Sequence, residues 1–224
     1  FSYIITVGWI IGITNAINLI DGLDGLSSGI TLISCVSLLI IFLLTPSSPL
    51  ISILLITALA GSIVGFLPFN FSPAKTFIGD VGSNFLGFSL AVISILGVAK
   101  TYTALVLIAP IIVLGLPIFD TIFAIIRRII KGKSIKAVFK ADKGHLHHRL
   151  MKRGYTQKQA VLILYGLTAT LGMFAIILLE SGIWKALSFA LLVIAIIAIG
   201  YKDIFRVKQD DIETIDETHI RTDK

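Results

Sequence analysis

The sequence predicts an all-α fold, a polytopic transmembrane helical bundle with about seven spans. Of its 224 residues 56% are apolar and 14% are charged, whereas about 25% are charged in an ordinary soluble domain. The apolar residues form continuous runs of roughly 20, the length that a helix needs to cross a bilayer. Barrel strands alternate over about ten residues, so these runs exclude a transmembrane barrel. The composition also excludes a disordered chain, a disulfide scaffold and a typical cytosolic enzyme.

Apolar segments of span length recur along the chain. We expect spans near residues 1–20, 28–45, 50–68, 84–99, 103–127, 159–179 and 184–201. Glycines four residues apart predict close helix packing, at Gly8/Gly12, Gly25/Gly29 and Gly61/Gly65. The chain starts at Phe1 with no basic leader, so we expect a fragment whose N-terminal spans are missing.

Basic residues gather in one connection between the expected spans. Eleven of the 19 Lys and Arg lie between Arg127 and Lys158. Basic loops of membrane proteins face the cytoplasm, which places the loop 128–158 there, together with the first and third connections and the polar tail 202–224. The same rule explains the net charge of +6, and we expect no nucleic acid as a partner.

The first polar cluster ends the first expected span. Asn15, Asn18, Asp21 and Asp24 recur every third residue, which predicts one polar stripe on a helix or a 3₁₀ turn. Ionisable groups at membrane depth are costly and usually functional. The structural alternative is a helix-ending loop with Asp caps, so a functional site is the preferred interpretation and not the only one.

The second cluster precedes the fourth expected span. Asp80 lies between Gly79 and Gly82, on the same predicted side as the first cluster. Mg²⁺ typically binds one or two carboxylates plus substrate phosphates, so we expect Asp80 to bind Mg²⁺, or Mn²⁺, with Asp21 beside it. An N-cap role for Asp80 is the structural alternative.

The third cluster lies in the basic loop, in the run His145-Leu146-His147-His148-Arg149. No cysteine is nearby and the flanking residues are cationic, which favours phosphate over zinc. A purely solvated loop is the alternative. Asp120 is the last acid at an apolar border; its role stays open, because it could simply pair with Arg127 or Arg128.

Together the three clusters predict a phosphoryl-transfer site on one membrane face. A metal and cationic side chains stabilise charge on a transferring phosphoryl group. An apolar bundle around such a site admits a lipid substrate.

Three stretches carry a family resemblance: NAINLIDGLDGLSSG, FIGDVGSNFLGF and HLHHRLMKRGY. In this order they resemble the polyprenyl-phosphate N-acetylhexosamine-1-phosphate transferase family (glycosyltransferase family 4). Leu146 interrupts the histidine run and Arg149 follows it, which favours the undecaprenyl-phosphate N-acetylglucosamine branch. The resemblance implies a multi-pass enzyme of the bacterial plasma membrane. It would move a sugar 1-phosphate from a UDP-sugar to a polyprenyl phosphate, release UMP and start a cell-envelope glycopolymer such as teichoic acid or O-antigen.

The resemblance also implies roles for individual residues. The expected catalytic residues are Asp21, Asp24, Asp80, His147 and His148, and the expected metal ligands are Asp80 and Asp21. The expected substrate-binding residues are Asn15, Asn18, Gly79, His145 and Arg149. The family's upstream Asp-Asp motif is absent from residues 1–224, so we expect residues 1–201 to form a catalytic domain that lacks part of its site and is inactive alone.

Three rival functions stay open. The nearest is phospho-N-acetylmuramoyl-pentapeptide transferase of peptidoglycan synthesis, which shares the chemistry. A secondary transporter would instead need acids near the bilayer midplane and inverted repeats. A non-catalytic membrane scaffold would not account for the three polar clusters. The sequence also leaves a homodimer open.

Overall fold

The computed structural model describes residues 2–98, 104–132 and 144–195. The chain divides into two compact units, Phe1–Glu180 and Ser181–Lys224. In the second unit the described part is the apolar helix Ile183–Ala195. The predicted tail 202–224 lies outside the described residues.

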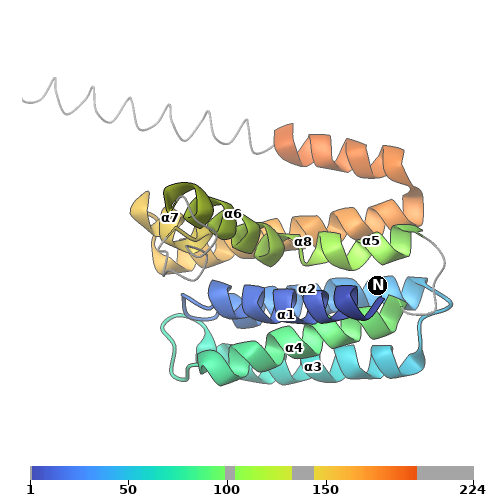
Figure 1. The fold of residues 1–224 in the computed structure, drawn as a ribbon, viewed down its shortest axis with the longest axis horizontal. Helices are drawn as coiled ribbons and strands as arrows, with labels where there is room; N and C mark the ends of the chain where they lie inside the picture. The colour runs from blue at the N-terminus through green and yellow to red at the C-terminus, as the bar shows by residue number, and fades with distance from the viewer. Residues whose placement is uncertain (1, 99–103, 133–143, 196–224) are drawn as a thin grey trace, which may run out of the picture. The chain divides into compact units, whose positions relative to one another are not determined.

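The described residues form an all-α structure (Figure 1). Its labelled helices are α1 Ser2–Ile20, α2 Leu26–Leu44, α3 Leu50–Asn70, α4 Gly79–Val98, α5 Ala104–Val113, α6 Gly115–Gly132, α7 Leu146–Lys152 and α8 Gln157–Ser181. Five of them are long and apolar enough to cross a membrane, and α5 with α6 makes a sixth if counted as one broken span. The predicted fold class is therefore confirmed, and about seven spans is close. Repeated apolar helices of this length make the chain a multi-pass membrane protein.

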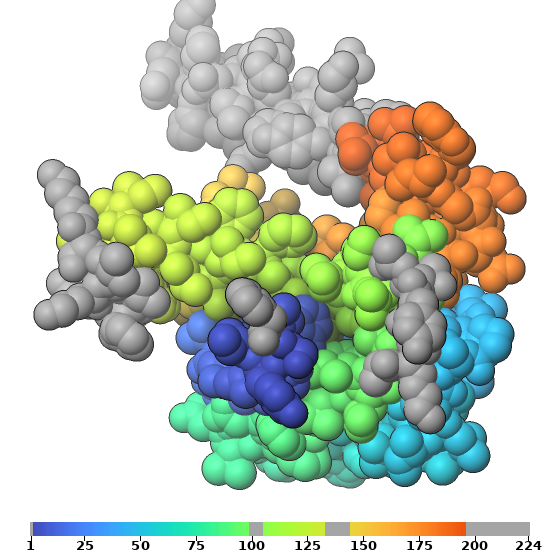
Figure 2. Space-filling model, turned by 45° about the vertical axis from the view of Figure 1, so that its right-hand side comes forward, coloured from blue at the N-terminus to red at the C-terminus, as the bar shows by residue number. Residues whose placement is uncertain are grey.

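Helix α2 is the most buried of the spanning helices, because about two thirds (67%) of its apolar segment is buried inside the bundle. It packs on α3, while α1 packs between α4 and α6, as Figure 2 shows for the face on which α1 is dark blue. The core is aliphatic, with Ile17, Leu38, Ile56 and Leu90 fully buried. Burying such side chains against one another stabilises the bundle and fixes where its polar ends meet.

Only some of the predicted glycine pairs lie where two helices approach closely. A Cβ at Gly29 would overlap the ring of Tyr165 from α8, so Gly29 does mark a close contact. Around Gly8, Gly12, Gly61 and Gly65, in contrast, no other part of the described chain would lie within 4 Å of an added Cβ. For these two pairs the predicted helix packing is wrong within the described chain, because four-residue spacing of glycines occurs on lipid-facing surfaces as well.

The predicted span 103–127 is wrong as a single helix. The structure breaks it at Leu114, and α5 and α6 meet at a bend of 68°. Pro117 accounts for the break: it has no N–H to donate to the carbonyl of Val113, and its ring would clash with that carbonyl. The helix therefore ends at Val113 and restarts at Gly115.

The predicted span 84–99 begins five residues earlier, at Gly79. Gly79 adopts a positive φ of 62°, a conformation that glycine reaches without steric cost. The change places Asp80 in the first turn of α4, and not in a turn before the helix.

Two connections and helix α8 meet at one end of the bundle. The backbone N–H of Ala74, between α3 and α4, donates to Asp24 Oδ2 between α1 and α2 (3.1 Å). Ser28 Oγ of α2 donates to Asn70 Oδ1 of α3 (2.6 Å). The hydroxyl of Tyr165, from α8, donates to the carbonyl of Gly25. These bonds hold the polar connections together and place their acids on one side.

Candidate active site

A cavity of about 470 Å³ opens where these connections meet. Its wall includes the carboxylates of Asp21, Asp24 and Asp80, together with Gly22, Gly79, Asn70 and Gln157. Asp21 and Asp24 come from the connection between α1 and α2, whereas Asp80 comes from the first turn of α4, more than 50 residues later in the sequence. The cavity is therefore built by packing of the bundle, and no single motif forms it.

Asp21 is the first residue after α1 and is partly buried. Its side chain accepts a hydrogen bond from Ser27 Oγ (Oδ1, 2.6 Å). Burial raises the pKa of Asp21, the bond from Ser27 opposes that rise, and the charge of Asp80 adds to it. Two carboxylates that repel each other across one cavity create a negative potential, which favours a bound cation.

Asp80 lies in the first turn of α4, where the helix dipole favours a negative charge. The amide of Asn18, from α1, contacts two residues of α4. It donates to Ser83 Oγ (2.8 Å) and more weakly to Asp80 Oδ1 (3.4 Å). This amide fixes the end of α1 against the start of α4. This geometry fits two roles for Asp80: stabilising the N-terminus of α4, and binding a cation.

The donor set suits a hard cation held with few protein ligands. Among the described residues, no three His, Cys, Asp or Glu side chains are grouped closely enough to hold a metal ion by themselves. Mg²⁺ often keeps several waters and uses one or two carboxylates plus substrate oxygens. Asp21 and Asp80, which face the same cavity and interact by charge, fit that pattern.

His147 lies directly behind the cavity wall. A Cβ at Gly22 would clash with Nε2 of His147, so the imidazole rests on the glycine backbone. The residue is 2% exposed, and neither ring nitrogen has a hydrogen-bond partner among the described residues. Burial, followed by the neighbouring His148, lowers the pKa of His147 to about 4. A neutral imidazole with unused nitrogens therefore lies next to the acidic cavity.

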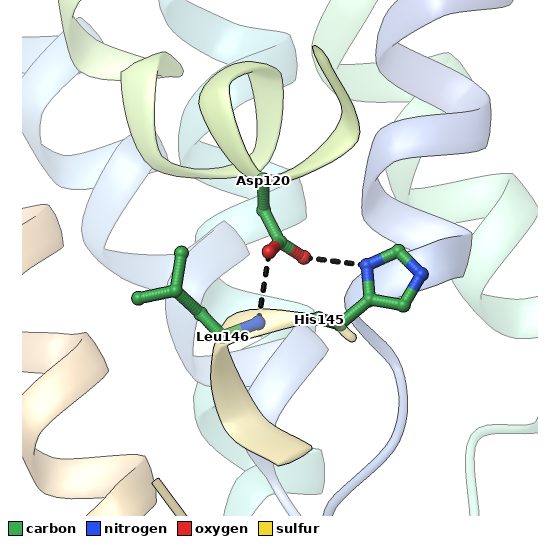
Figure 3. Close-up of polar contacts among 3 residues, drawn as sticks. All are labelled: Asp120, His145 and Leu146. Atoms are coloured by element: carbon green, nitrogen blue, oxygen red, sulfur yellow. Dashed lines mark hydrogen bonds and ion pairs between the residues drawn. The ribbon is translucent and has the colours of Figure 1, made fainter. Parts of the chain in front are cut away.

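His145 is bound to an acid that the sequence left unassigned. Its Nδ1 lies 2.8 Å from Oδ2 of Asp120, and the backbone N–H of Leu146 donates to Oδ1 of the same carboxylate at 2.9 Å (Figure 3). Asp120 lies in α6, and both it and His145 are buried. The signal for Asp120 in the sequence was an acid at the border of an apolar segment, where a charge is costly unless it has a partner.

Three further predicted residues, Asn15, His148 and Arg149, are not among those that line the acidic cavity. Asn15 is exposed and its amide donates to the carbonyl of Ile11 in its own helix. The ring of His148 lies beside that of His147, with 4.2 Å between centroids. Arg149 lines a different, smaller cavity with Arg153. Asn70 was not predicted; it lines the acidic cavity and donates to the carbonyl of Thr76.

Comparison with known proteins matches the part of the chain that builds this site. Residues 1–98 match the family model described as Glycosyl transferase family 4. The chain is 47% identical over 186 residues to a probable undecaprenyl-phosphate N-acetylglucosaminyl 1-phosphate transferase of Bacillus subtilis, covering 83% of this chain and 51% of the relative. It is 37% identical over 186 residues to a decaprenyl-phosphate N-acetylglucosaminephosphotransferase of Mycobacterium leprae, covering 73% of this chain and 45% of the relative.

A third relative is named for a different activity. It is a phospho-N-acetylmuramoyl-pentapeptide-transferase of Limosilactobacillus reuteri, 48% identical over 91 residues, which are 39% of this chain and 28% of the relative. The chain spans about half the length of the first two relatives. The family match and the long alignments agree with the three motifs and with the helical bundle that places two of them around one cavity. The chain belongs to glycosyl transferase family 4.

Proposed function

We propose that this chain forms part of an enzyme that transfers N-acetylglucosamine 1-phosphate from UDP-N-acetylglucosamine to undecaprenyl phosphate and releases UMP. The observation that carries the proposal is the cavity that three carboxylates share at one end of an apolar bundle. The activities for which the relatives from Bacillus subtilis and Mycobacterium leprae are named support the sugar and the lipid class.

Asp21 and Asp80 are the residues that would hold a divalent cation, Mg²⁺ or Mn²⁺. The ion would neutralise phosphate charge when it is bound. Asp24 lines the same cavity, and its Oδ2 is held by the N–H of Ala74, so its other oxygen can orient a substrate. His147 lies behind Gly22 with both ring nitrogens buried, so it would support the cavity wall as a neutral side chain and add no second buried charge.

The cavity would face the cytoplasm, at the plasma membrane of a bacterium. Arg127, Arg128 and Lys131 follow the apolar part of α6, and the positive-inside rule places such residues on the cytoplasmic side. A UDP-sugar could then enter from water, while the lipid phosphate approaches along the apolar helices. The acids lie at helix ends and not at mid-span, which favours a transferase over a secondary transporter.

The direct test is transfer by the full-length protein in membranes. Radiolabelled UDP-N-acetylglucosamine and undecaprenyl phosphate should yield labelled lipid and UMP. Asp80→Asn should lower turnover at least about 100-fold at saturating Mg²⁺, because it removes one proposed ligand but keeps the side-chain shape. Ser94→Ala is the matched control: Ser94 is in the same helix, accepts a bond from Trp9 Nε1 (3.0 Å) and lies roughly 21 Å along α4 from Asp80.

Each alternative has its own outcome. Transfer from UDP-N-acetylmuramoyl-pentapeptide and not from UDP-N-acetylglucosamine would make the peptidoglycan enzyme the correct assignment. No transfer from either donor would refute the proposed function. Near-normal turnover by Asp80→Asn would remove Asp80 from the metal site.

A further inference from the structure

We infer that Asp120 is a positioning residue, which holds His147 against the acidic cavity through His145 and the start of α7. The consequence for turnover rests on the function proposed above, while the geometry does not. Asp120 lies outside the three motifs that carry the family resemblance, and 25 residues separate it from His145.

Both oxygens of the Asp120 carboxylate are bound to the same short segment. Oδ2 lies 2.8 Å from His145 Nδ1, and Oδ1 accepts the backbone N–H of Leu146 at 2.9 Å. His145 is the N-cap residue of α7 but makes no side-chain capping bond, and Leu146 is the first residue of that helix. Asp120 therefore supplies, from α6, an acceptor for one of the N–H groups that have no partner inside the first turn of α7.

A helix of seven residues needs such an anchor. Helices of this length do not hold their own conformation in isolation, so their position is set by tertiary contacts. Asp120 and His145 are each only 4% exposed, so water cannot easily substitute for either partner. Losing one partner would leave the other buried and unsatisfied, which costs more than the bond itself contributes.

The anchor is connected to the cavity by stacked rings. The rings of His145 and His147 are nearly parallel, at an interplanar angle of 7° and a centroid distance of 5.9 Å. Nε2 of His147 lies against Gly22, which lines the acidic cavity. A shift at the start of α7 would thus move the imidazole that lies behind the cavity wall.

Gly22 is the opposing surface of this contact. Any side chain there would clash with the His147 ring. Gly22→Ala should therefore displace His147 from the cavity side, while Asp120→Asn displaces it from the α7 side. Two unrelated changes that perturb the same ring distinguish positioning from general destabilisation.

The first arm of the experiment measures turnover in the full-length protein. Asp120→Asn keeps an acceptor for Leu146 N–H but places an amide against His145 Nδ1. We expect kcat to fall about 10- to 100-fold, the effect of a small displacement beside the reacting groups, with a smaller change in KM for the lipid. In a His147→Gln background the same substitution should cost less than about threefold, because the residue through which it acts is already lost.

The second arm tests rescue at His145. Asparagine can offer an N–H close to the position of Nδ1, whereas alanine cannot. His145→Asn should therefore recover most of the turnover that His145→Ala loses. The comparison of His145→Asn with His145→Ala also tests the inference if Asp120→Asn fails to fold. Equal turnover by these two His145 variants would overturn the inference.

The third arm is independent of activity. Diethyl pyrocarbonate modifies accessible imidazoles, and mass spectrometry reports His147 relative to His148. Reaction of the buried His147 should rise severalfold in Asp120→Asn and Gly22→Ala and stay unchanged in Ser94→Ala. If the wild type transfers no sugar phosphate but this pattern holds, the proposed function fails and the positioning role stands. Wild-type reactivity of His147 in both Asp120→Asn and Gly22→Ala would overturn the positioning role.

Discussion

Asp21 and His147 lie next to Gly22, and burial shifts both of them toward their neutral forms. It raises the pKa of Asp21, an effect that Ser27 opposes and the charge of Asp80 increases. It lowers the pKa of His147 to about 4. A bound cation would favour the ionised form of Asp21 and so offset the free-energy cost of burying its charge. Asp21 is thus placed to gain from a bound cation.

The first consequence concerns stability against pH. The unfolded chain protonates His147 near pH 6.5, and the folded chain only near pH 4. Between these values the unfolded state binds more protons, so the free energy of unfolding falls as the pH is lowered. We expect the Tm of the full-length protein in detergent to drop more steeply from neutral pH to about pH 4.5 than the Tm of His147→Gln.

The control for that slope is Ser94→Ala, which removes a buried hydrogen bond but no titratable group. It should keep the wild-type pH dependence even if its Tm is lower throughout. Parallel curves for the wild type and His147→Gln would mean that His147 does not titrate differently on folding.

At the scale of helices, small residues decide where two backbones can approach. Gly29 of α2 accommodates the ring of Tyr165, whose hydroxyl donates to Gly25 at the preceding turn. That contact fixes α8 against the start of α2, just beyond the connection that carries Asp21 and Asp24. Gly65 of α3 is also inside a helix, but an added Cβ there would meet no other part of the described chain within 4 Å.

The two glycines therefore predict opposite effects of one substitution. Gly29→Ala should lower the free energy of unfolding by about 1–3 kcal/mol, because the methyl group overlaps Tyr165. Gly65→Ala should leave it unchanged or raise it by up to about 1 kcal/mol, since alanine favours the helix more than glycine. Denaturant unfolding in detergent measures both. Equal destabilisation by the two variants would contradict the contact of Gly29 with Tyr165.

Periodicity and hydropathy could predict which segments become helices, but not how they join. The apolar runs predicted the spans because each must bury or expose its side chains in lipid along its whole length. The break at Leu114 was missed because residues 104–119 form one continuous apolar run in which hydropathy marks no boundary. The residues that favour a break, Gly115 and Pro117, lie inside that run. The pairing of Asp120 with His145 was missed because its partners meet only after α6 and α7 pack.

For the whole molecule, the strongest sequence signal was that acids in separate connections share one end of the bundle. Asp21, Asp24 and Asp80 line one cavity, as alternating connections in a helical bundle require. Their exact partners depended on tertiary structure: Ser27, the N–H of Ala74 and the amide of Asn18. Sequence patterns place such groups on a membrane face, and packing then selects the atoms that meet.

The membrane orientation is the last prediction, and two exposed positions at opposite ends of α3 test it. Ser47 lies in the connection before α3, and Lys75 in the connection after it, beside the cavity. The native Cys35 is fully buried, and Cys35→Ala gives a cysteine-free background for the described chain. If the cavity faces the cytoplasm, a membrane-impermeant maleimide should label Ser47→Cys in intact cells and Lys75→Cys only after permeabilisation. The reverse pattern would place the acidic cavity outside the cell, where a UDP-sugar from the cytoplasm could not reach it.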